Sequence, residues 1–249
     1  MIERSAVYVF LMLMAFFSQT AVMAQSEVQV SSYIDIGENN ISEGLYSRSA
    51  ILGTYQIGKY NMNAGCQLDL KYPGDRIFSG ARFSGGRTFS IKNFDFEIQG
   101  LFIYSSFSKY LFETNWGILS KMQHRHFYFQ LGTNFRGYHL VENAFDQYDQ
   151  GINNKIRENW NVMYLIGYNL KPLDYKWNAG ITLTNIDHFT INQETNPMIY
   201  LHGKYQVSEP LVLYAETWYK SAGALNISVN YFGFFFRMGI IWKIDLEKK

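Results

Sequence analysis

This chain of 249 residues contains little cysteine and little charge, and both shortages exclude whole classes of protein. Its one cysteine, Cys66, cannot pair within the chain, so the fold does not rest on the disulfides of many small secreted domains. Charged residues make up 17% of the sequence, against about 25% in average globular proteins. The formal net charge of +1 gives no support for a nucleic-acid-binding surface.

Aromatic residues are what the chain has in excess, since Phe, Tyr and Trp make up 18% of it. Proline is rare, with four residues. Beyond residue 24 no apolar run is long enough to cross a membrane as a helix, which takes about 20 residues. This combination suits a transmembrane β-barrel, in which only one face of each strand has to be apolar.

Residues 1–24 predict a cleaved signal peptide. Arg4 precedes an apolar run from Val7 to Phe17, and Val22 and Ala24 fit the small-x-small pattern of a cleavage site. The apolar run is too short for a transmembrane helix, and no cysteine follows the cleavage site for a lipid anchor. We therefore expect an exported chain whose mature part, residues 25–249, forms a single barrel domain.

Large apolar residues alternate with small or polar residues along most of the mature chain, which predicts β-strands. In FFFRMGIIWKIDL, Phe234 to Leu246, every second residue is large and apolar, while Arg237, Gly239 and Lys243 lie between them. The same alternation recurs in residues 28–36, 62–72, 94–104, 127–136, 160–170, 175–184 and 199–207.

The connections between these segments alternate between short and longer ones. The short connections are at 59–61, 92–93, 120–125, 171–174 and 208–210, and the longer ones at 37–46, 72–76, 105–109, 140–158, 187–196 and 221–226. Short periplasmic turns and longer external loops are typical of outer-membrane barrels. We predict an all-β, single antiparallel transmembrane barrel of about twelve strands, with ten or fourteen as alternatives. The alternation changes phase near Gly233, where a bulge or a tight hairpin would account for it.

Alternation alone does not distinguish a soluble barrel from a membrane barrel, but the composition of the two faces favours the membrane. The polar face is mostly Asn, Gln, Gly, Thr and Ser, whereas soluble sheets present many Lys and Glu. The apolar face carries aromatic rings near predicted strand ends, as in the aromatic girdles of membrane barrels. These rings are Tyr72, Tyr104, Trp160, Tyr175, Trp177 and Trp242.

The end of the last predicted strand resembles the β-signal of bacterial outer-membrane barrel proteins. That signal is a polar residue, a glycine two positions on, and hydrophobic residues at the sixth and eighth positions, which Arg237, Gly239, Trp242 and Ile244 fill here. Such barrels often end on an aromatic residue, whereas this chain continues to Lys249. The resemblance implies assembly by the barrel assembly machinery and a bacterial outer-membrane location, with membrane lipid around the barrel.

Six charged residues are predicted to face the lumen, where a charge has to be paired or hydrated. They could form a network that closes the lumen, or line a narrow water path whose charges set ion selectivity. From the sequence both alternatives stay open. The six candidates are Arg82, Glu97, Arg136, Lys204, Glu216 and Arg237.

The sequence gives little support for catalysis. It contains no cofactor motif and no glycine-rich phosphate loop, so we expect no cofactor. His124 and His126 have a spacing at which two imidazoles could share a metal ion, but no third ligand is identifiable, so we predict no metal site. Ser120 beside His124, or His139 and His188 beside loop carboxylates, could supply parts of a hydrolytic site but lack a recognisable third group.

Three functional hypotheses follow. The leading one is a non-enzymatic narrow pore or small-solute transporter that uses the lumen charges. The second is a structural or partner-binding barrel of a surface or secretion assembly, which contacts a protein through the loops at 140–158 and 187–196. The third is an outer-membrane enzyme that hydrolyses lipid or peptide.

Overall fold

The computed structural model describes residues 26–39, 45–71, 77–91, 94–106, 111–140, 155–172, 175–220 and 232–246. No helix in these ranges is both long enough and apolar enough to span a membrane. Twelve β-strands lie in them: β1 (Ser26–Asn39), β2 (Leu45–Ile57), β3 (Tyr60–Asp69), β4 (Phe78–Ile91), β5 (Phe94–Ser106), β6 (Leu111–His124), β7 (Phe127–Leu140), β8 (Lys155–Asn169), β9 (Trp177–Thr184), β10 (Met198–Gln206), β11 (Leu211–Lys220) and β12 (Phe232–Asp245).

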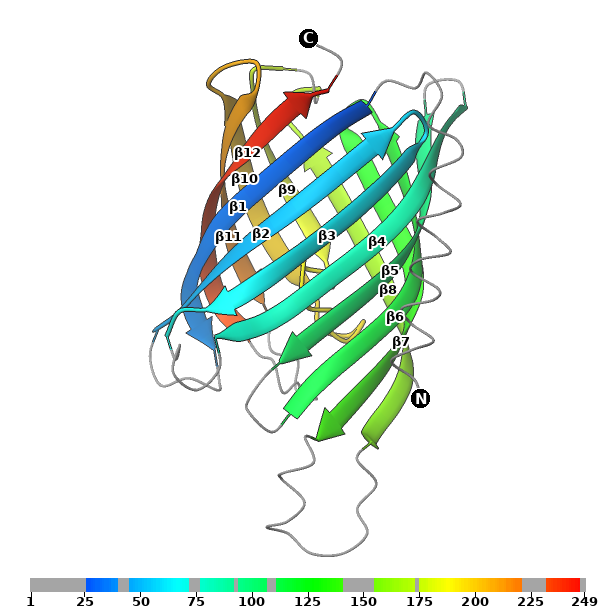
Figure 1. The fold of residues 1–249 in the computed structure, drawn as a ribbon, viewed down its shortest axis with the longest axis vertical. Coiled ribbons are helices and arrows are strands. Elements are labelled where there is room, and N and C mark those ends of the chain that lie inside the picture. The colour runs from blue at the N-terminus through cyan, green and yellow to red at the C-terminus, as the bar shows by residue number, and fades with distance from the viewer. Residues whose placement is uncertain are drawn as a thin grey trace, which may run out of the picture.

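The sheet closes on itself, because β1 pairs with β12 and every other strand pairs with its neighbours in sequence (Figure 1). All of these pairings are antiparallel, and the closing pair runs from Glu27 opposite Asp245 to Glu38 opposite Phe234. Closure removes the free strand edges that an open sheet would expose, which is what a membrane-spanning sheet requires. The prediction of an all-β antiparallel barrel with twelve strands is confirmed.

The two ends of the barrel differ in their connections. The short-turn end carries the turns at Gly58–Lys59 and Arg125–His126 and the connection at 207–210. Gly58 and Arg125 have φ angles of 55° and 49°, the left-handed conformation that two-residue hairpin turns need. The prediction of a turn over 120–125 was too early, because β6 continues to His124. The opposite end, which joins β7 to β8 and β9 to β10, is the long-loop end.

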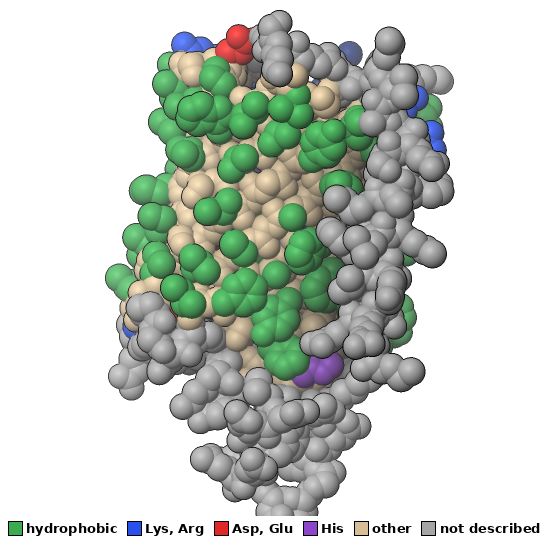
Figure 2. All heavy atoms as spheres, viewed as in Figure 1, with side chains coloured by type: hydrophobic (Ala, Val, Ile, Leu, Met, Phe, Trp, Pro, Cys, Tyr) green, Lys and Arg blue, Asp and Glu red, His purple; other side chains and the backbone are tan. Residues whose placement is uncertain are grey.

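The outward face of the wall is apolar and the inward face is largely polar. In β12, Trp242 is 52% exposed on the outside, whereas Arg237 is 0% exposed on the inside. Figure 2 shows hydrophobic side chains over the visible wall, with charged side chains near its ends. This distribution is the reverse of a soluble barrel and agrees with a lipid-facing exterior. Other exposed apolar residues include Ile34, Ile51, Phe83, Ile98, Trp116, Leu131, Trp160, Ile181, Leu201 and Ile240.

Gly233 is a β-bulge. Glu38 of β1 pairs with Phe234, but the next residue, Asn39, pairs with Phe232, so the register skips Gly233. An extra residue on one strand reverses the alternation beyond it. The bulge alternative is therefore confirmed at this position, and the strand count of twelve stands.

The connection between β9 and β10 folds into the barrel, and we call residues 185–197 the inward segment. It contacts side chains of β1, β2, β4, β5, β7, β11 and β12, so these residues lie inside the ring of strands. The prediction that 187–196 forms an external loop was wrong. Most of its side chains are buried or half-buried inside the barrel, whereas Glu194 and Thr195 are exposed.

Several predictions fall outside the described residues. They are the signal peptide over 1–24, the short turn at 92–93, and the loop regions 40–44, 72–76, 107–110, 141–154 and 221–231. The external loop predicted over 140–158 thus lies mostly outside them, and β8 begins within it at Lys155.

Candidate functional site in the barrel lumen

The inward segment starts where β9 ends short of its neighbour. β8 and β9 pair only from Leu165 opposite Thr184 to Asn169 opposite Gly180. The residues of β8 that precede Leu165 therefore have no partner strand on this side. Asn185 replaces that partner, since its Nδ2 donates to Val162 O at 2.7 Å and its Oδ1 accepts from Tyr164 N at 2.8 Å. The side chain amide thus satisfies strand groups that would otherwise be unpaired in the wall.

Apolar packing holds the middle of the inward segment. Ile186 and Ile191 form an antiparallel bridge with each other. Both pack against inward-facing Leu101, Ile103, Leu119 and Met163, so the lumen contains a small hydrophobic core. Phe189 is 1% exposed and packs against Tyr33, Ala50 and Leu52 on the opposite wall. Burial of this apolar surface favours the docked segment.

A cluster of one arginine and three carboxylates anchors the segment, and we call it the Arg237 cluster. Arg237 Nε and Nη2 donate to the two carboxylate oxygens of Asp35 at 2.7 and 3.0 Å. Its Nη1 and Nη2 also donate to the oxygens of Asp187 at 2.9 and 3.1 Å, and Nη1 donates to Glu216 Oε2 at 3.4 Å. The guanidinium lies 4.1 Å from the centre of the Tyr33 ring. Bidentate pairing of this kind is strong and directional.

Two titratable groups of the inward segment respond to this cluster. Burial alone would raise the pKa of Asp187, but the charge and hydrogen bonds of Arg237 lower it below its usual range. Burial, reinforced by the charge of Arg237, lowers the pKa of His188 to about 3. At neutral pH the docked segment therefore presents an anionic Asp187 and a neutral His188.

Other lumen cations bind backbone carbonyls or a side-chain amide of the inward segment. Arg82 Nη1 donates to His188 O at 3.1 Å, and Arg136 Nη2 donates to Ile191 O. Arg136 also pairs with Glu113, with 3.5 Å between Nε and Oε1. Lys220 Nζ donates to Asn192 Oδ1 at 3.0 Å. The carbonyl oxygens of His188 and Ile191 lie outside the strands of the wall and need hydrogen-bond donors. These contacts therefore fix the path of the segment as well as its position.

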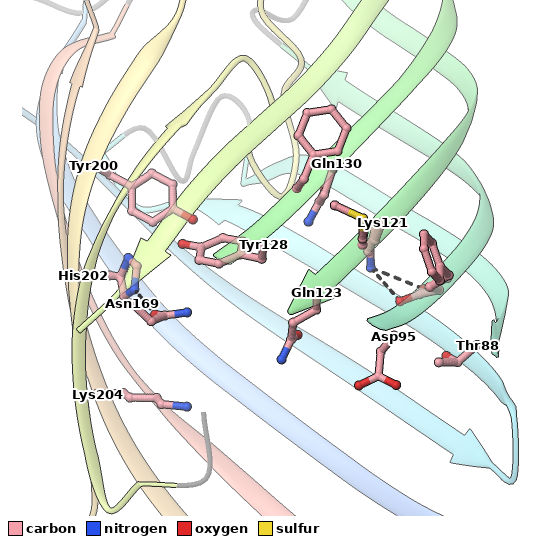
Figure 3. A pocket seen from close by; sticks show the side chains of 14 residues that line it. Thr88, Asp95, Lys121, Gln123, Tyr128, Gln130, Asn169, Tyr200, His202 and Lys204 are labelled. Carbon is pink, nitrogen blue, oxygen red and sulfur yellow. Dashed lines mark hydrogen bonds and ion pairs between the residues drawn. The ribbon is translucent and has the colours of Figure 1, made fainter. Parts of the chain in front are cut away.

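Between the inward segment and the short-turn end lies a cavity of about 360 Å³, which we call the lumen cavity (Figure 3). One wall, from β4 to β6, carries acidic residues and one lysine. The other wall, from β7, β8 and β10, carries tyrosines, amides, a histidine and a lysine. The residues that line it include Thr88, Asp95, Glu97, Lys121, Gln123, Tyr128, Gln130, Asn169, Tyr200, His202 and Lys204.

Contacts connect the lumen cavity to the Arg237 cluster. The ring of Tyr200, which lines the cavity, stacks on Trp218 with 3.9 Å between centroids. Trp218 Nε1 donates to Glu216 Oε2 at 2.7 Å, and the Arg237 guanidinium lies 5.4 Å from the Trp218 ring centre. Tyr200 therefore links the lining of the cavity to Trp218, which touches the anchor of the inward segment.

The six predicted lumen residues all face inward, and they fall into two groups. Arg82, Arg136, Glu216 and Arg237 surround the inward segment, directly or through Arg237. Glu97 and Lys204 line the lumen cavity, where Glu97 pairs with Lys121 at 3.3 Å. Four further charged residues of the lumen were not among the predicted ones. Their places in the alternation of inward and outward residues could have indicated them. They are Asp35, Glu113, Lys121 and Lys220.

The residues that match the β-signal split between the two faces of β12. Trp242 and Ile244 are exposed on the outer face. Arg237 has the structural role described above. Gly239 has one too, because a Cβ there would lie 2.5 Å from Ser32 O, 2.7 Å from Tyr33 Cβ and 2.8 Å from Tyr214 Cε1. Two of the four residues are thus explained by packing in the finished barrel, and recognition by the assembly machinery stays a prediction.

The histidines considered for chemistry are dispersed. The ring of His124 stacks on Phe94, whereas His126 lies in the turn itself and bonds through Nδ1 to Asn169 O at 2.9 Å. His139 Nε2 lies 3.1 Å from Thr114 Oγ1. Within the described part of the chain, no group of three or more His, Cys, Asp or Glu residues could hold a metal ion.

A closed antiparallel barrel with an apolar exterior and a charged, hydrogen-bonded lumen defines the outer-membrane β-barrel class. Among solved structures, the chain is similar to the NanC porin, with a TM-score of 0.54 and 9% identity over 87% of this chain and 100% of that one. It is also similar to the KdgM porin in complex with disordered oligogalacturonate, with a TM-score of 0.53 and 8% identity over 87% and 98% of the two chains. At such identities the similarity concerns the fold alone.

An outer membrane channel from Pseudomonas putida F1 is a further match, with a TM-score of 0.49 and 9% identity over 90% of this chain and 97% of that one. No protein-family model and no curated protein matches the sequence. The comparisons therefore identify the architecture of the chain and not its chemistry.

Proposed function

We propose that this protein is a non-enzymatic small-solute channel of the bacterial outer membrane, in which the inward segment is a resident gate. The observation that carries the proposal is the unequal filling of the lumen. Buried contacts occlude the half towards the long-loop end, while a polar cavity of about 360 Å³ lies in the other half. A purely structural barrel would not need such a cavity next to a docked loop.

The way the inward segment is fastened supports a movable gate. Its cationic partners are Arg82, Arg136, Lys220 and Arg237, which bind it through separate hydrogen bonds rather than through covalent links. Its two ends are adjacent, because Thr184 of β9 and Met198 of β10 are register partners. Residues 186–196 can therefore undock without breaking any strand pairing of the wall, while Asn185 keeps its bonds to β8.

The lumen arginines also bear on the kind of solute. The solved KdgM porin structure is a complex with oligogalacturonate, a polyanion. In this chain Arg136 pairs with Glu113, and Arg237 with Asp35, Asp187 and Glu216. Arginines neutralised in this way offer little attraction to a polyanionic chain. We therefore expect a small solute of low net charge.

Single-channel recording in planar bilayers tests the proposal. The wild-type protein, expressed from its full sequence and extracted from membranes, should show rare openings. A variant with a short Gly-Ser linker in place of residues 186–196 should show sustained ion-conducting steps. Glu194→Gln, which alters an exposed residue of the same segment, should behave like the wild type. A shortened variant that folds, by its heat-modifiable gel mobility, and yet stays silent would contradict the proposal.

A further inference from the structure

The lumen cavity has opposite charges on opposite walls. Asp95 and Glu97 of β5 carry two formal negative charges on one side, and Lys121 of β6 carries one positive charge there. Lys204 of β10 contributes +1 on the other side. β5 and β10 are five positions apart in a ring of twelve strands, so they face each other across the lumen (Figure 3).

The acidic wall is fixed by contacts within it. Lys121 Nζ lies 3.3 Å from both carboxylate oxygens of Glu97, so this pair is locally balanced. Asp95 accepts a hydrogen bond from Ser90 Oγ at 2.6 Å, a neutral donor. The negative excess of this wall therefore sits at Asp95, which is on the same face of β5 as the balanced Glu97.

The opposite wall is arranged around Lys204. His202 Nε2 bonds to Asn169 Oδ1 at 3.0 Å, which holds both side chains against the wall. Above them, Tyr128 and Tyr200 border the cavity, and the Tyr128 hydroxyl is bonded to Thr182 Oγ1. These tyrosines present ring surface, while their hydroxyls are already used. Lys204 is thus the cationic group of this wall.

We propose that the lumen cavity binds small zwitterions, namely free amino acids or short peptides, with the ammonium group towards Asp95 and the carboxylate towards Lys204. This inference rests on the proposed channel function and names its solute. Opposed rings of charge produce a field across a pore that selects by charge arrangement. A simple anion or cation would be attracted by one wall and repelled by the other. A zwitterion is attracted by both walls, and a neutral sugar by neither.

The size of the cavity agrees with this solute class. Small-molecule sites generally measure about 300–1,000 Å³, so the lumen cavity, at about 360 Å³, is near the lower limit. A dipeptide fits a site of that size, and a longer oligosaccharide does not. The backbone amide of a dipeptide would lie between the walls, within reach of Gln123 and Gln130, which also line the cavity.

Binding can be measured without transport, by saturation-transfer NMR of dialanine with the wild-type protein in detergent at pH 7. N-acetyl-dialanine lacks the ammonium group and dialanine amide lacks the carboxylate. We expect each to bind at least about tenfold more weakly than dialanine, as for the loss of one charge-assisted contact. Glucose should bind no better than these analogues. Equal binding of dialanine and either analogue, or stronger binding of glucose, would overturn the inference.

Variants locate the site. Lys204→Gln and Asp95→Asn should each weaken dialanine binding about tenfold. Lys176→Gln removes a lysine whose ammonium lies over the Tyr205 ring instead of in the cavity, and it should have no effect. If Lys204→Gln binds dialanine like the wild type while folding normally, the inference fails. The ligand series on the wild type remains decisive if a variant does not fold.

The two proposals can fail separately. Dialanine binding with no conductance from the shortened variant would overturn the channel and leave the binding site. Conductance without preference for zwitterions in the NMR series would overturn the binding site and leave the channel.

Discussion

Asp35 and Arg237 are direct register partners across the β1–β12 seam, and the Arg237 guanidinium forms ion pairs with both Asp35 and Asp187 of the inward segment. The residue that helps to close the barrel thus also fastens the segment that occupies it. A change at Arg237 disturbs both, whereas a change at either carboxylate disturbs one of them. Substitutions can therefore test separately how the cluster closes the barrel and how it holds the inward segment.

Asp187→Asn should loosen the inward segment without weakening the wall. Removing one partner of a buried ion pair costs about 3–5 kcal/mol, since the remaining charge is left uncompensated, although Asp35 and Glu216 reduce this here. We expect the open probability in planar bilayers to rise at least tenfold, while thermal unfolding shifts little. Glu194→Gln is the matched control, because it removes a carboxylate at an exposed position of the same segment. An unchanged open probability in Asp187→Asn would rule out this role.

Arg237→Gln should destabilise the barrel itself. Three carboxylates, those of Asp35, Asp187 and Glu216, would lose their common partner inside the lumen. We expect the temperature of the heat-modifiable transition on gels to fall by 10 °C or more, given a loss of about 3–5 kcal/mol. Lys243→Gln, an exposed cation of the same strand, should leave the transition where it is in the wild type. If the two variants show the same transition temperature, the cluster does not stabilise the seam.

Acid should open the channel, with His188 as the sensor. The pKa of His188 is lowered to about 3 in the docked segment by burial and by Arg237. In an undocked, hydrated segment it would return to about 6.5. Protonation therefore favours the undocked state as pH falls below about 6.5, by about 2 kcal/mol at pH 5. Between pH 7 and 8 we expect no change.

Recordings from pH 8 to pH 5 check this prediction. His188→Asn should lose most of the acid response in that range, whereas His126→Asn, which alters a turn at the short-turn end, should keep it. The lowered pKa of Asp187 works in the same direction but only below about pH 4, where its contribution to docking is lost on protonation. A wild-type open probability that is constant down to pH 5 would show that His188 is not the sensor.

Gly239→Ala should reduce the stability of the folded barrel, independently of any assembly defect. The added methyl group would lie within 2.5 Å of Ser32 O and within 2.7 Å of Tyr33 Cβ, which forces the seam apart at a cost of about 1–3 kcal/mol. Gly203→Ala is the matched control, because a Cβ at Gly203 meets nothing within 4 Å. Unfolding of protein refolded in detergent, without any assembly machinery, distinguishes packing from recognition. Equal stability of the two variants would assign Gly239 to recognition alone.

The wall of the barrel could be predicted from sequence because its determinants are local. Period-two alternation gave the correct faces for β12, with Arg237 inside and Trp242 outside, and the phase change at Gly233 indicated the bulge. The burial pattern repeats every two residues, so even a short window contains enough information. The even number of strands followed from the alternation of short and longer connections.

The contents of the lumen could not be predicted in the same way. Residues 186–196 are mostly polar, like an external loop, and only Ile186, Phe189 and Ile191 hint at burial. Their partners are far away in sequence: Arg237 is 202 residues from Asp35 and 50 from Asp187. The period-two alternation shows that a charged residue faces inward, but it does not show with which charged residue it pairs. For the same reason the sequence left open whether the lumen charges close the lumen or line a path.

The short span of the inward segment sets its kinetics. Thr184 and Met198 are neighbours across β9 and β10, so an undocked segment remains tethered at both ends beside its binding surface. A short tether of this kind corresponds to an effective concentration on the order of millimolar or higher. Even modest intrinsic affinity then gives rapid recapture, so openings of the wild-type protein should come as brief flickers rather than long plateaus. A cell would thereby admit solutes in small portions while keeping the barrier nearly intact.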